Sequence, residues 1–578
     1  MLFAAPLAAC ADDAHEVTAS DASEIRELTE AEVLADLDAL GTQIRTSYGL
    51  LDFKKARFGF DLDAELAAAR TKILAATTEG DRLRPFYELL AKLKDGHVSL
   101  SFTMRATSTT EHSIPMWLTP IGEDYYVSYD ASGLLVGDRL VSIDGKTAHE
   151  LEQLLLPLCE IGTLESSRHR VANLMSTRPF YAGPELQPHG AAAIVVVERD
   201  GVNVRLELSW GRKSGGTTGL VRPPLASTPP VPGASDGTAL ALEHILGSGP
   251  EGSRWQSGAA EPWFLTPTTA KDLGIAPVTP RPETLAKYGA PTDFGEALQL
   301  GAYRYTFEGK NVLLLRIPTF NLRSAAYDEH VAWVSALLDD TNADASTDVV
   351  VIDTSHNPGG KFFYVEGLIS MFLTKPIPNE LIAERANRSL VQRYVGHANS
   401  AASDLDAYTV WRARLSGIEA ANDRGDLLAP FTPGWGAIMG PTVPRRGLVA
   451  TGEPTLSPHP LVTWKGPILV LQDELAGSCG DVFPALMQNG GVAKTFGART
   501  AGMGGPRGDY TLPVSNAYLA LTSGLFGPAD GEGGIENIEN DGVVPDYPRA
   551  LTPADLRNGY VDYVRDFSKV AVGLAPSR

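Results

Sequence analysis

The sequence has few cysteines, no surplus of basic residues and no long apolar run, and each lack argues against a class of protein. Three cysteines in 578 residues are too few for a disulfide framework, and their spacing forms no metal cluster. The 49 Lys and Arg are outnumbered by 70 Asp and Glu, and the formal net charge of −21 argues against nucleic acid as a main partner. The 11 histidines are scattered without a His-Glu-x-x-His motif, so neither a metal nor another cofactor is expected.

What remains is an ordinary globular composition. Charged residues make up 21% of the chain and hydrophobic residues 43%, and both values are typical of folded proteins. At about 150 residues per domain, a chain of this length is expected to hold roughly three to five domains. A chain this long can bury a sizeable core without covalent cross-links.

A short apolar segment at the start of the chain ends at Cys10. It is too short to span a bilayer as a helix, and acidic sequence follows at once. The run Leu7-Ala8-Ala9-Cys10 resembles a bacterial lipobox, where a signal peptide is cut before a cysteine that becomes lipidated, although the usual basic region is missing. The alternative is a frayed terminus with a chance cysteine, and whether Met1 is the true start stays open. We expect lipidation at Cys10 and an extracytoplasmic protein, in the periplasm or on the outer membrane.

Helical periodicity dominates residues 22–105, and strand patterns follow it. The last helix of this stretch ends at the Asp-Gly-His sequence of residues 95–97, because glycine is a natural helix stop. Residues 137–145 then form a strand that ends in an Asp-Gly turn, and a helical segment follows. This order of strand, turn and helix resembles a PDZ domain; the alternative is an arbitrary hairpin with a helix. Cys159 lies in an apolar run and is expected in the core.

From residue 310 onward, buried strands alternate with helices, which predicts an α/β domain with a mostly parallel sheet. Continuous apolar runs predict three strands, at 311–317, 348–353 and 466–471. Helical patterns follow these runs, at 327–338, 363–372 and about 479–488. Between the second and third strands, residues 375–462 have a weak pattern with many charges and several prolines, which indicates an insertion.

Ser478 stands between the third predicted strand and the helix that follows it. Ser478 and Asp481 form the Ser-x-x-Asp pattern of a capping box, so one interpretation is that Ser478 only caps the helix. The other interpretation is that Ser478 is a nucleophile. At the same position, the N–H groups and the dipole of the helix N-terminus would favour an oxyanion. The N–H of Cys479 would then stabilise a tetrahedral intermediate formed on the Ser478 oxygen. The motif alone leaves both interpretations open.

Two further motifs carry possible chemistry. Asn357-Pro358-Gly359-Gly360 follows the second predicted strand, at the carboxyl edge where open α/β sheets bind ligands. It is either a turn that ends the strand or, through Gly359 or Gly360, a second donor to an oxyanion. His97 is either a surface or capping residue or a general base, and a base would need hydrogen-bond reach of Ser478 and an acidic residue to orient it.

These motifs occur together in an order that resembles the C-terminal processing peptidases and the tricorn protease. They are serine peptidases whose core is similar to the crotonase and Clp protease fold. Their order is a helical segment, DGH, a PDZ-like module, NPGG, the nucleophilic Ser, a Gly-rich stretch and GVxPD. The matching segments here lie at 95–97, 137–145, 357–360, 478–481, 497–505 and 539–546. The resemblance implies a serine endopeptidase that cleaves proteins or peptides without a cofactor or metal.

One departure from the family pattern bears on the mechanism. In one branch, a Lys from the Gly-rich stretch serves as the base, and the matching position here is Met503, which cannot accept a proton. Lys494 and Arg499 are nearby but out of register with the motif. The resemblance therefore disfavours a Ser-Lys dyad and favours the tricorn-like branch, where a His from the N-terminal part acts as the base.

In that branch the roles fall on Ser478 as nucleophile, His97 as base and Glu539 as the acidic residue behind it, with Glu536 as an alternative. The tricorn motif has a relay Ser directly before its His, but glycine stands there in this chain, and Ser99 is an unassigned substitute. Cys479 could itself be proposed as a nucleophile. We disfavour that role, because the family uses the main-chain N–H at this position and the sequence shows no cation that would stabilise a thiolate.

The sequence thus predicts an α/β fold with a crotonase- and Clp-protease-like catalytic core, an N-terminal helical segment and a PDZ-like β-rich module. The expected parts are a signal and tether (1–21), a helical domain (22–105), the PDZ-like module with adjoining strands (112–212), a Pro/Gly-rich linker or insertion (213–300), the core (301–374 and 463–578) and an insertion (375–462).

Two other functions stay open. One is a catalytically inactive ligand- or peptide-binding protein on the same fold, since a fold does not guarantee a reaction. The other is a scaffold whose active part is the PDZ-like module. The expected partner is a protein or peptide substrate, with membrane contact only through a lipid at Cys10. The sequence leaves the cleavage preference and the oligomeric state open.

Overall fold

The computed structural model describes residues 27–102, 110–214, 261–290, 300–321, 324–344, 346–400, 405–433 and 455–576. Cys10, with the predicted lipobox, and most of the predicted linker at 213–300 lie outside these ranges, so lipidation at Cys10 stays a prediction. Within the described ranges, no helix combines the length and the apolar character that crossing a bilayer requires.

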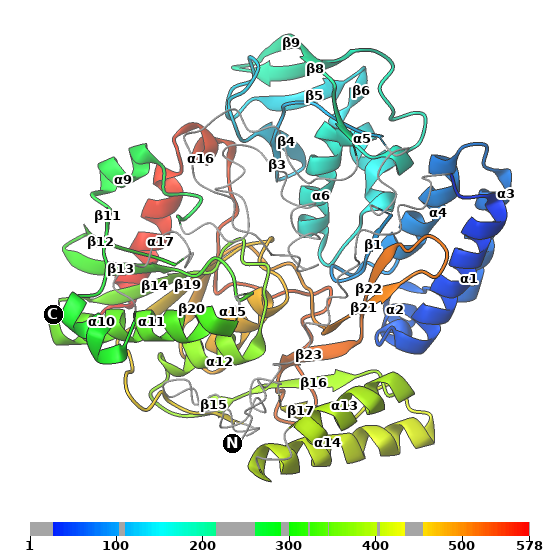
Figure 1. Ribbon diagram of the computed structural model, residues 1–578. Helices are drawn as coiled ribbons and strands as arrows, with labels where there is room; N and C mark the ends of the chain where they lie inside the picture. Colours follow the sequence, from blue (N-terminus) through cyan, green and yellow to red (C-terminus); the bar gives the residue numbers. More distant parts are fainter. Residues whose placement is uncertain are drawn as a thin grey trace, which may run out of the picture.

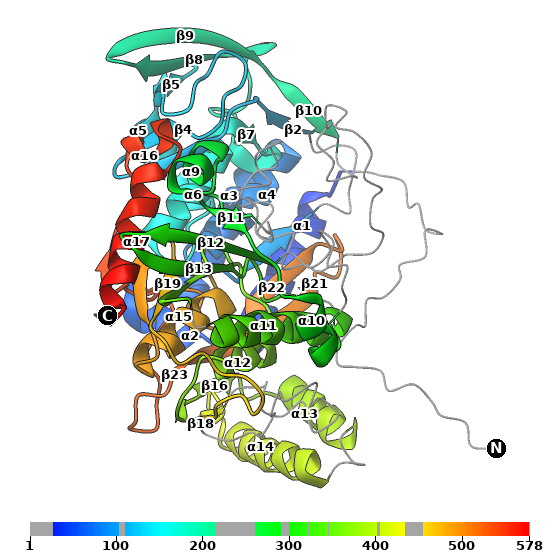
Figure 2. The same ribbon diagram turned by 90° about the vertical axis from the view of Figure 1, so that its left-hand side faces the viewer.

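The described residues form a helical domain, a β-rich module and an α/β core, and a helical hairpin lies below the core (Figures 1 and 2). The helical domain begins with a capping box, in which the Thr29 hydroxyl and the Glu32 carboxylate each accept a backbone N–H of the other residue. The helices of this domain are α1 (Glu30–Ser47), α2 (Leu51–Phe58), α3 (Leu62–Ala75) and α4 (Glu79–Ala91).

The helical domain packs on strands from the far end of the chain. Leu37, Ile44 and Phe86 share one buried cluster with Leu519 and Leu521. Just after the residue 95–97 turn, strand β1, which contains Ser99, pairs antiparallel with the middle strand of a three-stranded sheet. The strands of this sheet are β1 (Ser99–Ser101), β22 (Tyr518–Thr522) and β21 (Arg507–Thr511). The pairing places His97 beside the C-terminal part of the chain.

The β-rich module lies at the top of Figure 1. Its main sheet runs in the order β3-β4-β5-β8-β9, and β6 pairs with β5. The predicted strand and Asp-Gly turn are confirmed, since β5 ends at Ile143 and both Asp144 and Gly145 have positive φ. Cys159 is buried and its thiol contacts the carbonyl of Leu155, which confirms its place in the core. The likeness to a PDZ domain stays a prediction.

The main sheet of the module consists of β3 (Leu118–Ile121), β4 (Asp124–Val127), β5 (Arg139–Ile143), β6 (Lys146–Thr147), β8 (Ala192–Arg199) and β9 (Val202–Ser209). A smaller sheet consists of β2 (Thr110–Ser113), β7 (Thr177–Arg178) and β10 (Gly211–Ser214). The helical elements are α5 (Ala148–Leu155), η1 (Leu156–Leu158), α6 (Leu164–Ser176) and η2 (Phe180–Ala182).

The α/β core is built on a seven-stranded sheet in the order β11-β12-β13-β14-β19-β20-β24. The strands from β13 to β24 run parallel, whereas β12 pairs antiparallel with β13. The sheet consists of β11 (Ala276–Pro277), β12 (Gly301–Phe307), β13 (Lys310–Arg316), β14 (Val349–Asp353), β19 (Ile468–Gln472), β20 (Lys494–Gly497) and β24 (Tyr547–Pro548). The three buried strands predicted from apolar runs are therefore confirmed, and the mixed α/β fold with them.

Both faces of this sheet are covered. Leu313 and Leu315 point to a cluster that contains Phe483 of α15, whereas Leu314 points to the opposite cluster with Phe567 of α17. Strands covered on both faces need apolar residues at every position, which explains their unbroken hydrophobic runs. The helices of the core are α9 (Pro267–Leu273), α10 (Pro282–Tyr288), α11 (Ser324–Asp344), α12 (Phe362–Ser370), α15 (Cys479–Asn489), α16 (Pro553–Arg557) and α17 (Val561–Leu574).

The segment at 375–462 contains two helices that its weak sequence pattern did not predict. They form a hairpin whose own small core includes Tyr394 and Trp411, with ring centroids 5.3 Å apart. A narrow apolar contact between two helices leaves most positions polar, so the periodicity is weak. The elements of this segment, with the strand β23 that pairs with β16, are β15 (Ile377–Pro378), β16 (Glu380–Glu384), α13 (Arg388–Ser400), α14 (Leu405–Arg424), β17 (Thr432–Pro433), β18 (Thr455–Leu456) and β23 (Gly524–Pro528).

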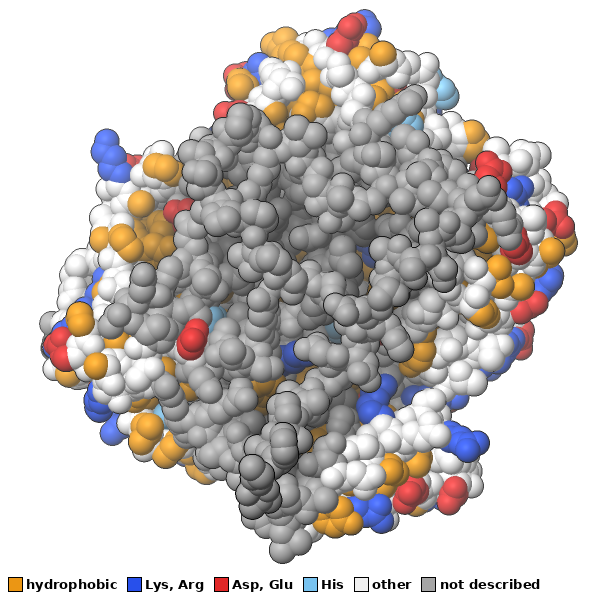
Figure 3. Space-filling view, viewed as in Figure 1, with side chains coloured by type: hydrophobic (Ala, Val, Ile, Leu, Met, Phe, Trp, Pro, Cys, Tyr) orange, Lys and Arg blue, Asp and Glu red, His pale blue; other side chains and the backbone are white. Residues whose placement is uncertain are grey.

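The charges of the described surface are mixed. On the face drawn in Figure 3, Lys and Arg side chains lie interspersed with Asp and Glu around the rim. Hydrophobic side chains gather at the top of this view, over the β-rich module. Val202 of β9, an edge strand of that module, is among the exposed apolar residues, with 64% of its surface accessible.

One buried carboxylate joins the helical domain to the hairpin of β21 and β22. Asp36 of α1 is 1% exposed and accepts the backbone N–H groups of Val514 and Ser515, each at 2.9 Å. We expect Asp36→Ala to lower the free energy of unfolding by about 2–4 kcal/mol, because two buried donors lose their acceptor. Asp38→Ala is the control and should cost below about 1 kcal/mol, since Asp38 pairs with Arg70 in solvent. Urea denaturation measures both, and equal losses would contradict the role of Asp36.

Candidate active site

Ser478 stands at the junction of β19 and α15 with a backbone conformation that few residues other than glycine adopt. Its φ is 58° and its ψ is −123°, and its side chain makes no capping hydrogen bond to α15. The Asp481 carboxylate instead accepts the N–H groups of Gly502 at 2.9 Å and of Met503 at 3.1 Å. The capping-box interpretation of Ser478 is therefore wrong, and its half-buried hydroxyl is not used by the helix.

The turn at residues 357–360 packs directly on the backbone around Ser478. Gly359 has a φ of 98°, and a Cβ atom there would lie 2.6 Å from the Ser478 Cβ and 2.7 Å from the Cys479 nitrogen. The Gly477 N–H donates to the Asn357 carbonyl at 3.0 Å and joins the two loops. Only glycine allows this approach, so the Asn-Pro-Gly-Gly turn does more than end a strand.

Two backbone N–H groups lie beside Ser478 without an acceptor. Within the described residues, neither the N–H of Gly360 nor that of Cys479 makes a hydrogen bond. Gly359 differs, because its N–H donates to the Asn357 Oδ1 atom at 2.9 Å. The Cys479 thiol contacts the Gly360 carbonyl at 3.3 Å and holds the two segments together. Of the two glycines considered, Gly360 thus has the N–H that is available.

His97 lies in a buried turn after α4 and is not a surface residue, since it is 8% exposed. The Asp95 carboxylate organises this turn, because it accepts the His97 N–H at 2.9 Å and the hydroxyl protons of Thr522 at 2.8 Å and Tyr48 at 2.9 Å. Burial lowers the pKa of His97 to about 4, and Arg507 lowers it as well, while Asp95 opposes both. The imidazole is therefore neutral at pH 7 and able to accept a proton.

Met503 connects the loops that carry Ser478 and His97. Its side chain is buried between the glycines that precede these two residues. A Cβ atom at Gly96 would lie 2.5 Å from the Met503 Cε, and one at Gly477 would lie 2.8 Å from its Sδ. Met503, which stands where the resemblance described above would place a lysine base, thus packs the two loops together. The His97 Nδ1 atom is buried and has no hydrogen-bond partner among the described residues.

Glu539 reaches the same region from the C-terminal part of the chain and is fully buried. Its Oε2 atom accepts the Gly504 N–H at 2.8 Å, and its Oε1 atom forms an ion pair with the Lys54 ammonium. Burial raises the pKa of Glu539 to about 7; Lys54 lowers it and Asp95 raises it further. Within the described residues, no hydrogen bond joins Glu539 to the His97 ring.

The other candidates of the sequence lie elsewhere. Glu536 is exposed and binds the Asn489 side chain at 2.6 Å. Lys494 is paired with Asp546 at 2.8 Å, and Arg499 donates to a backbone carbonyl. None of these three contacts involves Ser478 or His97.

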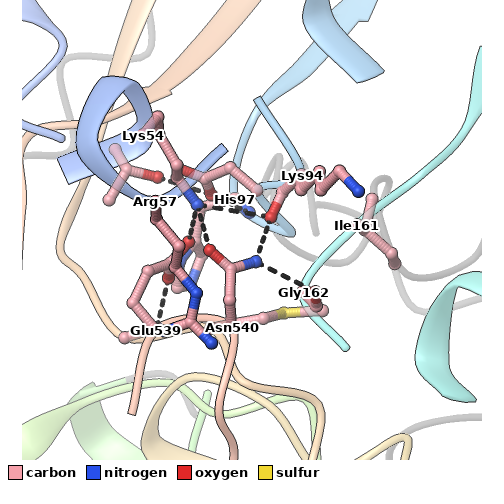
Figure 4. Close-up of polar contacts among 12 residues, drawn as sticks. Lys54, Arg57, Lys94, His97, Ile161, Gly162, Glu539 and Asn540 are labelled. Atoms are coloured by element: carbon pink, nitrogen blue, oxygen red, sulfur yellow. Dashed lines mark hydrogen bonds and ion pairs between the residues drawn. The ribbon is translucent and has the colours of Figure 1, made fainter. Parts of the chain in front are cut away.

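Lys54 is a residue of this region that sequence reasoning missed. Its side chain is completely buried and meets Glu539 and Asn540 (Figure 4). Its position in a short helix beside the exposed Lys55 and Arg57 suggests an ordinary solvated face. No local pattern in the sequence distinguishes Lys54 from these neighbours.

Comparison with known proteins identifies the family of the core. Residues 311–549 match the model of peptidase family S41. A protein of Chlamydia pneumoniae is 24% identical over 584 residues, which cover 95% of this chain and 91% of that protein. The tricorn protease of Thermoplasma acidophilum is 33% identical over 127 residues, which cover 21% of this chain and 11% of the protease.

Solved structures show that the similarity extends over the whole fold. The structure of mature CPAF complexed with lactacystin has a TM-score of 0.70 at 19% identity, and covers 94% of this chain and 99% of its own. A crystal structure of mature CPAF has a TM-score of 0.69 at 19% identity, and covers 94% of this chain and 97% of its own. At this level of identity the likeness establishes a shared fold.

The two described cysteines should be unreactive in the native protein. Both thiols are buried, and burial raises the pKa of Cys159 to about 12 and that of Cys479 well above its ordinary value. We expect iodoacetamide at about pH 8 to leave both unmodified until denaturant is added, because the thiolate is the reactive form. Peptide mass spectrometry measures this, and alkylation of native Cys479 would show that its thiol is accessible.

Gly359→Ala tests the close packing beside Ser478. The added methyl group would collide with the Cys479 nitrogen, and we expect labelling of Ser478 by a fluorophosphonate to slow by about 10²-fold or more. Gly425→Ala is the matched control, because Gly425 also has a positive φ but no atom lies within 4 Å of its added Cβ. Equal labelling rates in the two variants would mean that the contact at Gly359 does not matter.

Proposed function

We propose that this chain, whose residues 311–549 match the model of peptidase family S41, is a serine-type peptidase that acts on proteins or peptides through an acyl-enzyme. Ser478 is the nucleophile, His97 is the general base and Glu539 is the acidic residue behind that base. The observation that carries the proposal is the strained, uncapped Ser478, which lies against two unused N–H groups and shares Met503 with the His97 turn.

The first half of the reaction uses the neutral His97. Its imidazole takes the Ser478 proton as the oxygen attacks a peptide carbonyl, and the N–H groups of Cys479 and Gly360 stabilise the oxyanion. The resulting imidazolium then donates its proton to the leaving amine, and an acyl ester remains on Ser478. In the second half, His97 activates a water molecule, which releases the acyl group and restores the serine.

The available alternatives for nucleophile and base have less support. The buried Cys479 thiol donates to the Gly360 carbonyl and its pKa is raised by burial, so it remains protonated. A lysine base would have to replace Met503, and Lys494 is committed to Asp546. An inactive binding protein on the same fold stays the alternative function, and it requires no strained serine beside free N–H donors.

Ser478→Ala tests the proposal directly. We expect the hydrolysis of an unfolded protein substrate such as casein to fall by about 10⁴-fold or more, because the nucleophile is lost, while the melting temperature stays near that of the wild type. A fluorophosphonate probe should label the wild type at Ser478.

Cys479→Ser is the matched control for this experiment. It keeps the backbone N–H and a side-chain donor to Gly360 but removes the thiol, so activity should stay within about 10-fold of the wild type. Retained hydrolysis in Ser478→Ala would overturn the mechanism. Absence of both labelling and hydrolysis in the folded wild type would favour the inactive binding protein.

A further inference from the structure

We propose that Lys54 is a positioning residue for the function proposed above, on which this inference rests. Its ammonium pairs with Glu539 and ties that carboxylate to the turn that carries His97. Neither the family motifs nor the local sequence assigns Lys54 a role.

The contacts of Lys54 join three distant segments. Its ammonium donates to the Asn540 Oδ1 atom at 2.5 Å and to the Lys94 carbonyl at 3.3 Å, and it forms the ion pair with Glu539. An ammonium has three protons, so these three acceptors satisfy it fully. Lys94 directly precedes the Asp-Gly-His turn, and the ammonium therefore links the proposed acid to the loop of the proposed base (Figure 4).

Asn540 completes this network. Its Nδ2 atom donates to the Lys94 carbonyl at 2.5 Å and to the Gly162 carbonyl at 2.9 Å, while its Oδ1 atom accepts from Lys54. Gly162 belongs to the segment between α5 and α6 of the β-rich module. Lys54 thus sits at the point where the helical domain, the module and the core meet.

Stability alone does not account for an ammonium at this position. Its side chain has no exposed surface, and removing two charges from water costs much of what their attraction returns. Apolar residues of similar volume in place of both partners would fill the same space without that cost, whereas loss of Lys54 alone would leave Glu539 buried without its counter-charge. The placement is explained by what the charge does to Glu539.

The surroundings of Glu539 show what that charge does. Four charged or titratable groups interact electrostatically with the Glu539 carboxylate. They are Lys54 and Arg57 from α2, Tyr48 at the end of α1 and Asp95 from the His97 turn. Burial and Asp95 favour the protonated carboxyl, and Lys54 is the largest influence in the opposite direction. Without Lys54 the pKa of Glu539 rises from about 7, so the carboxyl is neutral at neutral pH. A neutral carboxyl does not stabilise the imidazolium that forms on His97.

Lys54→Gln and Lys54→Met test this role. Gln keeps hydrogen-bond donors without the charge, and Met keeps the length of the side chain. For each variant that folds, we expect kcat at pH 7 to fall by about 10-fold or more with KM changed by less than about 2-fold, and the acidic limb of the kcat–pH profile to move up by about one unit or more. Lys55→Met, which changes the exposed neighbour, is the matched control and should leave the profile unchanged.

A double variant separates positioning from general damage. If Lys54 acts through Glu539, Lys54→Gln combined with Glu539→Gln should be no slower than Glu539→Gln alone. A folded Lys54 variant with the wild-type pH profile would overturn the inference, and so would failure of both Lys54 variants to fold, which would mark a structural role. The failure of the proposed function is distinguishable, because it would appear as hydrolysis retained in Ser478→Ala, whatever the Lys54 variants show.

Discussion

The arrangement of the candidate site depends on how closely the backbone at residues 501–505 packs against its surroundings. The Asp481 carboxylate of α15 accepts two N–H groups of this segment, and the Glu539 carboxylate accepts a third. A Cβ atom at Gly504 would lie 2.5 Å from the Glu539 nitrogen, so the segment tolerates no larger residue there. Burial raises the pKa of Asp481 to about 6, and the hydrogen bonds it accepts oppose this shift. The backbone of this segment thus connects α15, which follows Ser478, to Glu539.

This constraint explains why the helical domain belongs to the site although it lies far from the core in the sequence. The His97 turn can rest against Met503 only because β1 pairs with β22 and Asp36 holds the hairpin of β21 and β22. Lys54 then fills the interior of the same junction. The proposed base and the proposed positioning residue therefore come from a domain that is held in place by strands from the other end of the chain.

The predictions that succeeded rested on local physical signals. A strand covered on both faces must be apolar at every position, so β13, β14 and β19 are visible as unbroken runs. Other features gave a misleading signal or none. The Ser-x-x-Asp pattern around Ser478 is that of a capping box, yet the Ser478 side chain makes no capping hydrogen bond and the Asp481 carboxylate accepts N–H groups of the Gly-rich segment. The helices α13 and α14 pack mainly against each other in a small core of their own. Each helix therefore has only a weak apolar stripe in its sequence.

What the sequence by itself determined is the α/β core, the helical domain before it and the loops that would carry a serine, a histidine and a glycine turn, because each of these is encoded by neighbouring residues. Only the tertiary structure decided how those loops meet. It showed that Met503 packs between Gly96 and Gly477 and that Lys54 is buried against Glu539. It also showed that the N–H of Gly359 donates a hydrogen bond within its own turn, whereas that of Gly360 makes none among the described residues. The contacts of Met503 and Lys54 join segments far apart in the chain, and an ion pair or a close backbone approach leaves no periodic trace in either segment alone.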